Sequence, residues 1–213
     1  IGVAMTKNSK TVTSAVGNTL SSQATNTTTT LDTITYTEGV PDNVRDDLKG
    51  LTTQQVKDTL ETHRTPMITV CMNLTSDFNK ASVIRAHNAF LGNDIIIVGK
   101  RRFDRRGTVG TYHYETIKHT PNFMDVYSHL RERGYTLIAV DNTPQFSPQS
   151  VYDTNIPRHA AFIYGEEQKG LSEDVVALCD MVVYIPQYGS VRSINVAQAA
   201  AVMMSEYNRR HRP

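Results

Sequence analysis

The sequence predicts an α/β domain in which helices cover both faces of a parallel β-sheet. From residue 67 onward, short apolar segments of strand character alternate with amphipathic helical patterns. One of these segments, Ile95-Ile96-Ile97-Val98, contains only apolar residues, as expected for a parallel strand that is buried on both faces. Strands separated by helices in this way are typical of a three-layer α/β domain.

Ordered structure is expected to begin near Pro41, after a segment of low complexity. Residues 1–40 are rich in Ser, Thr and Asn and include four consecutive threonines at 27–30. A segment with so few large apolar side chains cannot bury enough surface to offset the entropy lost on ordering, so we expect it to be disordered. Residues 41–66 would then form a helical extension, and residues 67–213 the α/β domain.

The remaining elements follow from local patterns in chain order. Thr52 and Gln55 have the spacing of a capping box. Val56 and Leu60 follow at i and i+4, which predicts a short helix up to about residue 64. Further along the chain, strands are expected at 67–74, 94–99, 135–140, 160–164 and 181–185, and helices at 80–91, 122–133, 172–178 and 194–209.

The composition limits the classes of function. Lys and Arg total 22 against 21 Asp and Glu, which gives a net charge of +1. An anionic partner would therefore have to be bound by a local cluster of cations. Cys71 and Cys179 both lie in apolar segments, which favours reduced core cysteines over a disulfide. No apolar run has the length of a membrane span and no signal-peptide pattern is present, so we expect no membrane partner and a cytoplasmic location.

Several common catalytic motifs are missing from the sequence. The seven histidines form no zinc-binding pattern, and G-x-S-x-G, G-x-G-x-x-G and P-loop motifs are absent. This argues against the simplest hydrolase, dinucleotide-binding and NTPase functions, and no metal site is expected.

Two segments place polar residues where expected strands end and helices begin. Asn79 is expected to cap the helix that follows the first strand of the domain, and Arg85 comes six positions later. The segment Gly165-Glu166-Glu167-Gln168-Lys169-Gly170-Leu171 follows another strand. In this segment Gly165 would let a ligand approach the backbone, and Glu167 would orient loop amides. Each segment alone also fits an ordinary β–α connection.

A third segment connects the last strand to an Ala-rich helix. It reads Ile185-Pro186-Gln187-Tyr188-Gly189-Ser190-Val191-Arg192-Ser193-Ile194-Asn195-Val196. Gly189 would permit close backbone approach, and Ser193 and Asn195 stand near the expected helix start. There their side-chain oxygens can cap free N–H groups or contact a ligand.

In this order, the patterns N-x5-R, G-x-E-x-x-G-L and I-P-x-x-G-x-x-x-S-I-N-V resemble the motifs of the SpoU (TrmH) branch of the SPOUT methyltransferases. The resemblance covers residues 67 to 208, with departures at Gln168, Gln187 and residues 197–198. It implies a sheet with a deep trefoil knot at its carboxyl end, one of the rare exceptions to unknotted chains. It also implies S-adenosyl-L-methionine as cofactor, a homodimer, and methylation of a ribose 2′-hydroxyl in tRNA or rRNA.

The resemblance also implies roles for particular residues. The catalytic set would be Arg85, Asn79, Glu167, Ser193 and Asn195. The cofactor would be bound by Thr143, Gly165, Ile185, Gly189, Ser193 and Ile194. A guanidinium has no acceptor site and a pKa above about 12, so it is a poor general base. We therefore expect Arg85 to bind the phosphate next to the target ribose and to stabilise the developing alkoxide.

A basic segment follows the second strand of the domain. Its five cations are Lys100, Arg101, Arg102, Arg105 and Arg106, with Phe103 among them and Tyr112 and Tyr114 beyond. Cations and aromatic rings together favour binding of RNA phosphates and stacking of bases, although a solvated loop has the same composition. Two alternatives to ribose methylation stay open, namely a SPOUT base methyltransferase and an RNA-binding assembly factor without turnover.

Overall fold

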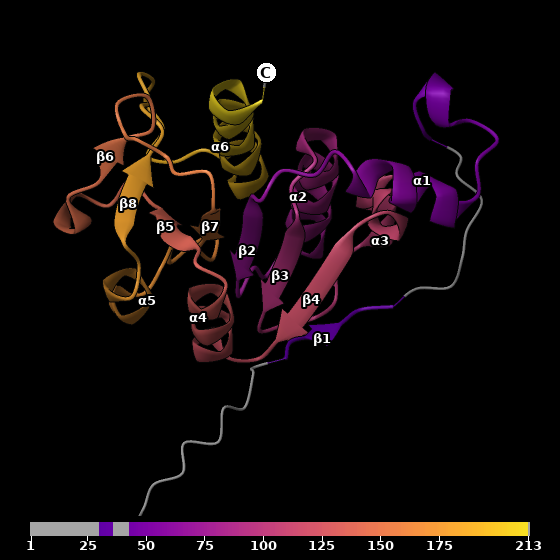
Figure 1. Cartoon of the computed structure of the whole chain (residues 1–213). Coiled ribbons are helices and arrows are strands. Elements are labelled where there is room, and N and C mark those ends of the chain that lie inside the picture. The colour runs from indigo at the N-terminus through magenta and orange to yellow at the C-terminus, as the bar shows by residue number, and fades with distance from the viewer. Residues whose placement is uncertain (1–29, 36–42, 213) are drawn as a thin grey trace, which may run out of the picture.

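The computed structural model describes residues 30–35 and 43–212. Within these residues the chain forms an eight-stranded sheet in the order β1-β4-β3-β2-β7-β5-β8-β6 (Figure 1). Every neighbouring pair is parallel except β1 and β4, which are antiparallel. The strands are β1 (Asp32–Thr33), β2 (Ile68–Met72), β3 (Asp94–Val98), β4 (Thr116–Thr120), β5 (Thr136–Val140), β6 (Gln149–Ser150), β7 (Ala160–Tyr164) and β8 (Met181–Tyr184).

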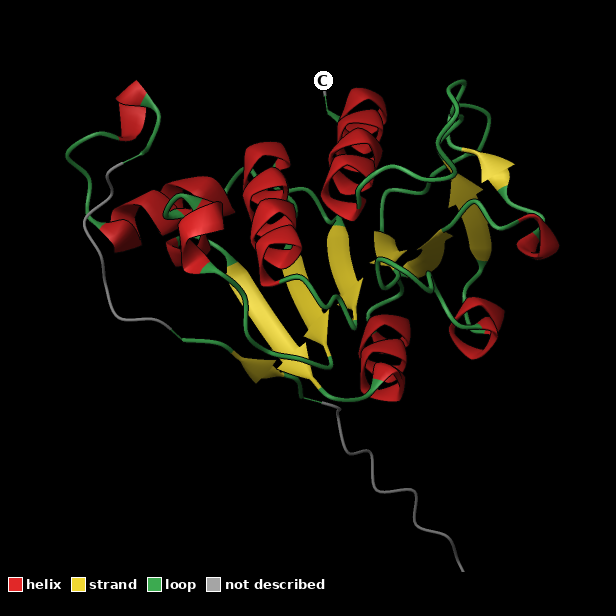
Figure 2. Cartoon of the chain, turned by 180° about the vertical axis from the view of Figure 1, so that it is seen from behind, coloured by secondary structure: helices red, strands yellow, loops and turns green. Residues whose placement is uncertain are grey.

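Helices cover both faces of this sheet, as the sequence predicts. They are α1 (Thr53–Glu61), α2 (Asp77–Phe90), α3 (Arg105–Thr108), α4 (Phe123–Glu132), α5 (Glu173–Ala177) and α6 (Val196–His211). Figures 1 and 2 show α2 and α6 side by side. On their face of the sheet, Val83 and Met203 share a buried core with strand residues. On the other face, Val126 of α4 and Val175 of α5 belong to a separate core.

Some elements differ from the sequence-based expectation. The strand β4 was not expected because its sequence, TIKHT, carries a lysine and a histidine and has only Ile117 as a large apolar residue. The basic segment contains a helix, α3, where a loop was expected. The short strand β1 lies within the segment expected to be disordered, where Leu31 and Ile34 are buried against the core. Residues 1–29 and 36–40 of that segment lie outside the described ranges.

Two helix starts also differ from the expectation. The N-cap of α2 is Ser76, whose hydroxyl accepts a hydrogen bond from the Asn79 backbone N–H, so Asn79 is not the cap. The helix α6 begins at Val196 with Asn195 as its N-cap. The capping box of α1 is confirmed, because Thr52 and Gln55 exchange both hydrogen bonds.

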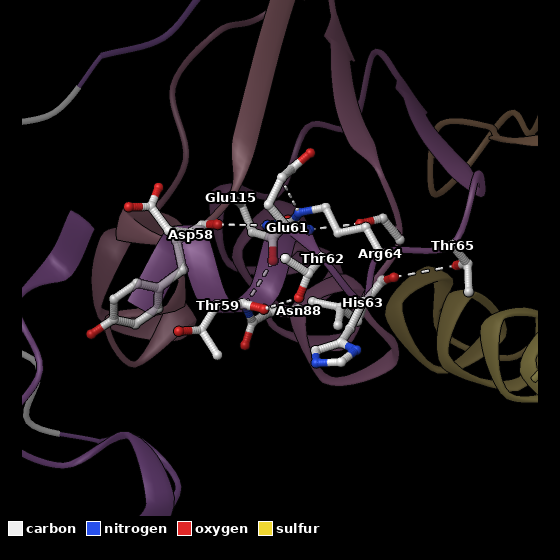
Figure 3. Close-up of polar contacts among 12 residues, drawn as sticks. Asp58, Thr59, Glu61, Thr62, His63, Arg64, Thr65, Asn88 and Glu115 are labelled. Atoms are coloured by element: carbon white, nitrogen blue, oxygen red, sulfur yellow. Dashed lines mark hydrogen bonds and ion pairs between the residues drawn. The ribbon is translucent and has the colours of Figure 1, made fainter. Parts of the chain in front are cut away.

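A buried ion pair joins the segment after α1 to the α/β domain (Figure 3). Arg64 donates to the Glu115 carboxylate at 2.9 Å and to the Gly92 carbonyl at 2.6 Å. Asn88 donates to the other Glu115 oxygen at 2.7 Å. Burial raises the pKa of Glu115 to about 7, although Arg64 and Asn88 favour its ionised form. The side chains of Arg64 and Glu115 are 5% and 0% exposed, so this contact is part of the protein interior.

Candidate active site

A cavity of about 640 Å³ opens where β5, β7 and β8 reach their carboxyl ends. This volume lies within the range of small-molecule sites, and the carboxyl edge of an open α/β sheet is where such folds bind ligands. Its wall includes many residues that the sequence predicted for the site, namely Asn79, Thr143, Gly165, Glu167, Ile185, Ser193, Ile194 and Asn195. The structure thus brings the three motif segments together.

Glu167 binds the amino-terminal turn of α2. One carboxylate oxygen accepts from the N–H and hydroxyl of Thr75, at 2.9 and 3.0 Å. The other accepts from the Ser76 N–H at 3.1 Å and from the Asn79 side-chain amide at 2.9 Å. Burial opposes ionisation of Glu167, but these hydrogen bonds outweigh it and lower the pKa to about 2. The carboxylate is therefore ionised at neutral pH, with both of its oxygens engaged.

Asn79 and Asn195 extend this contact to α6. The Asn195 side-chain amide donates to the Asn79 side-chain oxygen at 3.0 Å. The Asn195 side-chain oxygen in turn accepts from the Ala197 N–H at 2.8 Å, which caps α6. One chain of hydrogen bonds therefore joins the loop after β7 to the amino-terminal turns of α2 and α6.

Asp141 is a residue of the site that the sequence interpretation missed. One of its oxygens accepts from the N–H and hydroxyl of Thr143, and the other accepts from the Leu171 N–H at 3.3 Å. This carboxylate joins the loop after β5 to the loop after β7. An Asp directly after an apolar strand, with Thr two positions later, has the pattern of a local side-chain turn and is the signal that could have found it.

Gly165 is required by the fold of its own loop, in addition to the expected approach of a ligand. A Cβ at this position would lie 2.3 Å from the Gly170 carbonyl carbon and 2.5 Å from the Leu171 nitrogen. Glu166 and Gly170 form an isolated β-bridge directly beside it. The absence of a side chain therefore lets the loop fold back on itself, rather than only leaving room for a ligand.

Comparison with known proteins connects these motifs to a family. The model of the SpoU rRNA Methylase family matches residues 66–205, about two thirds of the chain. The chain belongs to the SpoU family.

Relatives of the SpoU family have similar sequences over part of their length. The tRNA (guanosine(18)-2'-O)-methyltransferase of Escherichia coli (strain K12) is 26% identical over 153 residues, which cover 68% of this chain and 65% of that protein. The protein of the same name from Thermus thermophilus is 30% identical over 100 residues, which cover 47% and 50%. The chain spans less than two thirds of the length of these curated relatives.

Solved SpoU structures share the fold. The methyltransferase AviRb from Streptomyces viridochromogenes, solved in complex with the cofactor AdoMet, has a TM-score of 0.59 and 26% identity, covering 68% of this chain and 58% of that one. The TrmH/SpoU tRNA modifying enzyme of A. aeolicus has a TM-score of 0.66 and 20% identity, covering 74% and 81%.

Two of the residues predicted for catalysis or cofactor binding in this SpoU protein, Arg85 and Gly189, lie outside the cavity wall. Arg85 lies on the exposed side of α2, six residues after Asn79, which corresponds to about 9 Å along the helix axis. Gly189 is exposed, and a Cβ there would meet open space. Arg85 therefore does not line this cavity in the single chain.

The basic segment of this SpoU protein lies next to α2 and is joined to it by ion pairs. Asp77 pairs with Lys100 at 3.1 Å and with Arg102 at 3.6 Å, and Asp104 pairs with Arg106 at 2.8 Å. All five cations predicted for RNA binding are exposed. The aromatic residues expected to stack bases are not all available, because Phe103 and Tyr114 are only 8% and 7% exposed and pack in the core.

No helix in the described part of the chain is long and apolar enough to span a bilayer. Within the same residues, no group of three or more His, Cys, Asp and Glu side chains is arranged to hold a metal ion.

Proposed function

We propose that this SpoU family member uses S-adenosyl-L-methionine to methylate a ribose 2′-hydroxyl in tRNA or rRNA. The observation that carries the proposal is the hydrogen-bonded chain Glu167–Asn79–Asn195, which unites the three motif segments in the wall of one cavity. The names of the relatives, which are tRNA and rRNA guanosine-2'-O-methyltransferases, support the same reaction.

The cavity fits the cofactor in size and in polarity. Two of its lining residues, Tyr164 and Gln187, have a buried oxygen with no hydrogen-bond partner among the described residues. Buried polar atoms are nearly always paired, so these two are suited to hydrogen-bond a polar ligand. When bound, the cofactor would supply an electrophilic methyl group. Thr143, Gly165, Ile185, Ser193 and Ile194 would hold it, with Gly189 in the adjoining exposed loop.

Glu167 serves as a positioning residue in this proposal. A carboxylate that has a pKa of about 2 and already accepts four hydrogen bonds has little capacity to take a proton from a ribose hydroxyl. Its contribution is to fix Asn79 and the amino-terminal turn of α2. Asn195, and Ser193 beside it, would then present fixed polar groups to the ribose and the cofactor.

Arg85 would act on the RNA rather than on the cofactor. Its exposed position on α2 suits a contact with the phosphate next to the target ribose. There its planar fork would bind phosphate oxygens and stabilise negative charge on the 2′-oxygen during transfer. The proton of the hydroxyl would pass to that phosphate or to water.

We also propose that the chain forms a homodimer and carries the trefoil knot of its family. Tyr188 and Val191, in the loop beside the cavity, are 94% and 62% exposed, and such apolar surface is typical of an interface. Asn142, after β5, donates to the Arg192 carbonyl at 2.7 Å, so the two segments that would form the knot are in contact. The free thiols of Cys71 and Cys179 support a reducing cytoplasm.

The test of the reaction is methyl transfer from labelled S-adenosylmethionine to RNA, followed by nucleoside analysis. We expect 2′-O-methylnucleosides. Base-methylated nucleosides would favour a base methyltransferase, and RNA binding without heat of S-adenosylmethionine binding or transfer would favour an assembly factor.

Substitution of Arg85 tests its role directly. Arg85→Ala should abolish transfer while the Kd for S-adenosylmethionine stays within a few fold. Arg85→Lys should recover little activity, because an ammonium cannot reproduce the planar fork. Arg45→Ala, which removes another exposed arginine, is the matched control. Near-normal turnover of both Arg85 variants would contradict the assignment.

The basic segment allows a graded test of RNA binding. Arg101 and Arg105 have no carboxylate within ion-pair distance in the described structure, whereas Arg102 and Arg106 do. Each phosphate contact adds about 0.7 to 0.9 to the slope of log affinity against log salt concentration. Replacing Arg101 and Arg105 by Ala should reduce that slope by about 1.5, and replacing Arg102 and Arg106 should reduce it less. An unchanged slope in both variants would mean that the basic segment is solvated and does not contact RNA.

A further inference from the structure

An aromatic side chain lies exposed at the first turn of α2. Phe78 is the second residue of this helix and is 61% exposed, whereas Phe103 of the basic segment is buried. It directly precedes Asn79 of the proposed active site. A large apolar side chain in this exposed position does not contribute its full area to the core, so its surface is available to a partner.

The ring of Phe78 rests against the basic segment. The position that a Cβ of Gly107 would occupy lies 3.3 Å from two Phe78 ring carbons and 2.8 Å from the Ala81 Cβ. Gly107 therefore lets α3 pack closely on α2 with the ring beside it. This close packing holds Phe78 at a fixed place next to the cations.

A hollow of about 540 Å³ lies in the basic segment, and its wall includes Asp77, the residue that precedes Phe78. Its lining residues are Asp77, Arg102, Phe103, Asp104, Arg105 and Arg106. The ion pairs of Asp77 and Asp104 orient Arg102 and Arg106. Five exposed cations face two carboxylates in this region, so its charge is positive overall and suits a phosphate.

The exposed face of α2 continues from Phe78 toward Arg85. Phe78, Ser82, Arg85 and Ala89 follow at i, i+4, i+7 and i+11, which places them on one face of the helix. All of them are at least partly exposed. Phe78 and Arg85 are about 10 Å apart along the axis, a distance that a short stretch of single-stranded RNA can span.

We propose that Phe78 and the adjoining hollow bind an unpaired nucleotide of the RNA substrate, with its base stacked on the ring and its phosphate on the cations. The inference rests on the proposed function and deepens it, because it selects unpaired RNA over duplex. Aromatic rings stack on bases that are splayed out of a helix, and such bases occur in loops and single strands. A second copy of this chain is a poor occupant of this face, since it would bring two positively charged surfaces together.

The test uses binding of a labelled 12-nucleotide oligoadenylate and of a duplex of equal length, both without cofactor. Stacking on one base corresponds to roughly 5- to 150-fold in affinity, and we expect about tenfold weaker oligoadenylate binding by Phe78→Ala. Phe78→Tyr should bind normally. Phe78→Leu keeps an apolar side chain against Gly107 without the ring, and should bind as weakly as Phe78→Ala. Tyr152→Ala, which removes an aromatic side chain of similar exposure (55%), is the matched control.

Three results would overturn the proposal. The first is oligoadenylate binding of wild-type strength by Phe78→Leu, and the second is an equal loss of duplex binding. The third is a change in oligomeric state of the Phe78 variants in sedimentation, which would assign the ring to a protein interface. These measurements need no methyl transfer, so the failure of catalysis by the wild-type chain and the failure of the stacking site are distinguishable.

Discussion

Substitution of Glu167 by Gln is the sharpest test of how the site is held together. The carboxylate accepts four hydrogen bonds, two on each oxygen. A Gln amide has one oxygen and one NH₂ group, so it can accept only one of these two pairs. Each lost hydrogen bond to a charged acceptor is worth about 1.5 kcal/mol, which predicts a loss of about 3 kcal/mol in the free energy of unfolding. The corresponding decrease in Tm is about 6 to 12 °C for a protein of this size.

The measurement is urea or thermal unfolding of the wild-type protein, of Glu167→Gln and of Glu166→Gln. Glu166 lies in the same loop, and its hydrogen bonds with Gly170 come from its backbone, so its variant controls for the loss of one charge. We also expect a distinct pH dependence. The pKa of Glu167 is lowered from 4.5 to about 2, so its contribution is complete above pH 4.5 and is lost as the pH falls toward 2. Stabilities of the two variants within 0.5 kcal/mol of each other (roughly the spread of neutral surface substitutions) would refute the reasoning.

Two further substitutions test the scaffold around the site. Arg64→Ala leaves the Glu115 carboxylate buried without its charged partner and should lower the free energy of unfolding by about 3 to 5 kcal/mol. Arg45→Ala removes an exposed ion pair and should lower it by less than about 1 kcal/mol in the same denaturation assay. In Gly165→Ala the new Cβ would meet backbone atoms, so this variant should be less stable and should bind S-adenosylmethionine more weakly in calorimetry. In Gly189→Ala the new Cβ would meet open space, so this variant should keep its stability. Equal effects within either pair would contradict the structural explanation.

The architecture could be predicted largely from apolar patterning. The five expected strands are present because each is a short apolar segment, and three of them, β2, β3 and β7, are buried along their whole length. The strand β4 escaped prediction because only Ile117 carries its apolar signal, and its partners β3 and β1 stabilise it through backbone hydrogen bonds. Pairing between segments far apart in sequence leaves no local pattern, so such a strand is recognised only in the folded structure.

The sequence predicts many residues that line the site, but not the contacts between them. Asn79 has the residue type of an N-cap, and Ser76 competes for the same role three positions earlier. Because Ser76 caps the helix, the Asn79 side chain is free to bind Glu167 and Asn195 instead. The earlier start also sets Arg85 further along α2. Six residues correspond to about 600° of rotation, so Arg85 and Asn79 face different directions. The sequence spacing gives this difference in direction only if both residues lie within the helix. That condition could be checked only once the structure placed the helix start at Asp77.

The first turn of α2 is where the proposed RNA surface and the cofactor cavity meet. Asp77, Phe78 and Asn79 are consecutive, and successive side chains of a helix point about 100° apart. Asp77 binds cations of the basic segment, Phe78 is exposed, and Asn79 joins the hydrogen-bonded wall of the cavity. Glu167 fixes this turn through the backbone of Ser76 as well as through Asn79. A displacement of the turn by RNA would therefore also shift the cavity wall. We expect RNA binding on this face and cofactor binding in the cavity to be coupled. By linkage, RNA must then change the affinity for the cofactor by the same factor by which the cofactor changes the affinity for RNA.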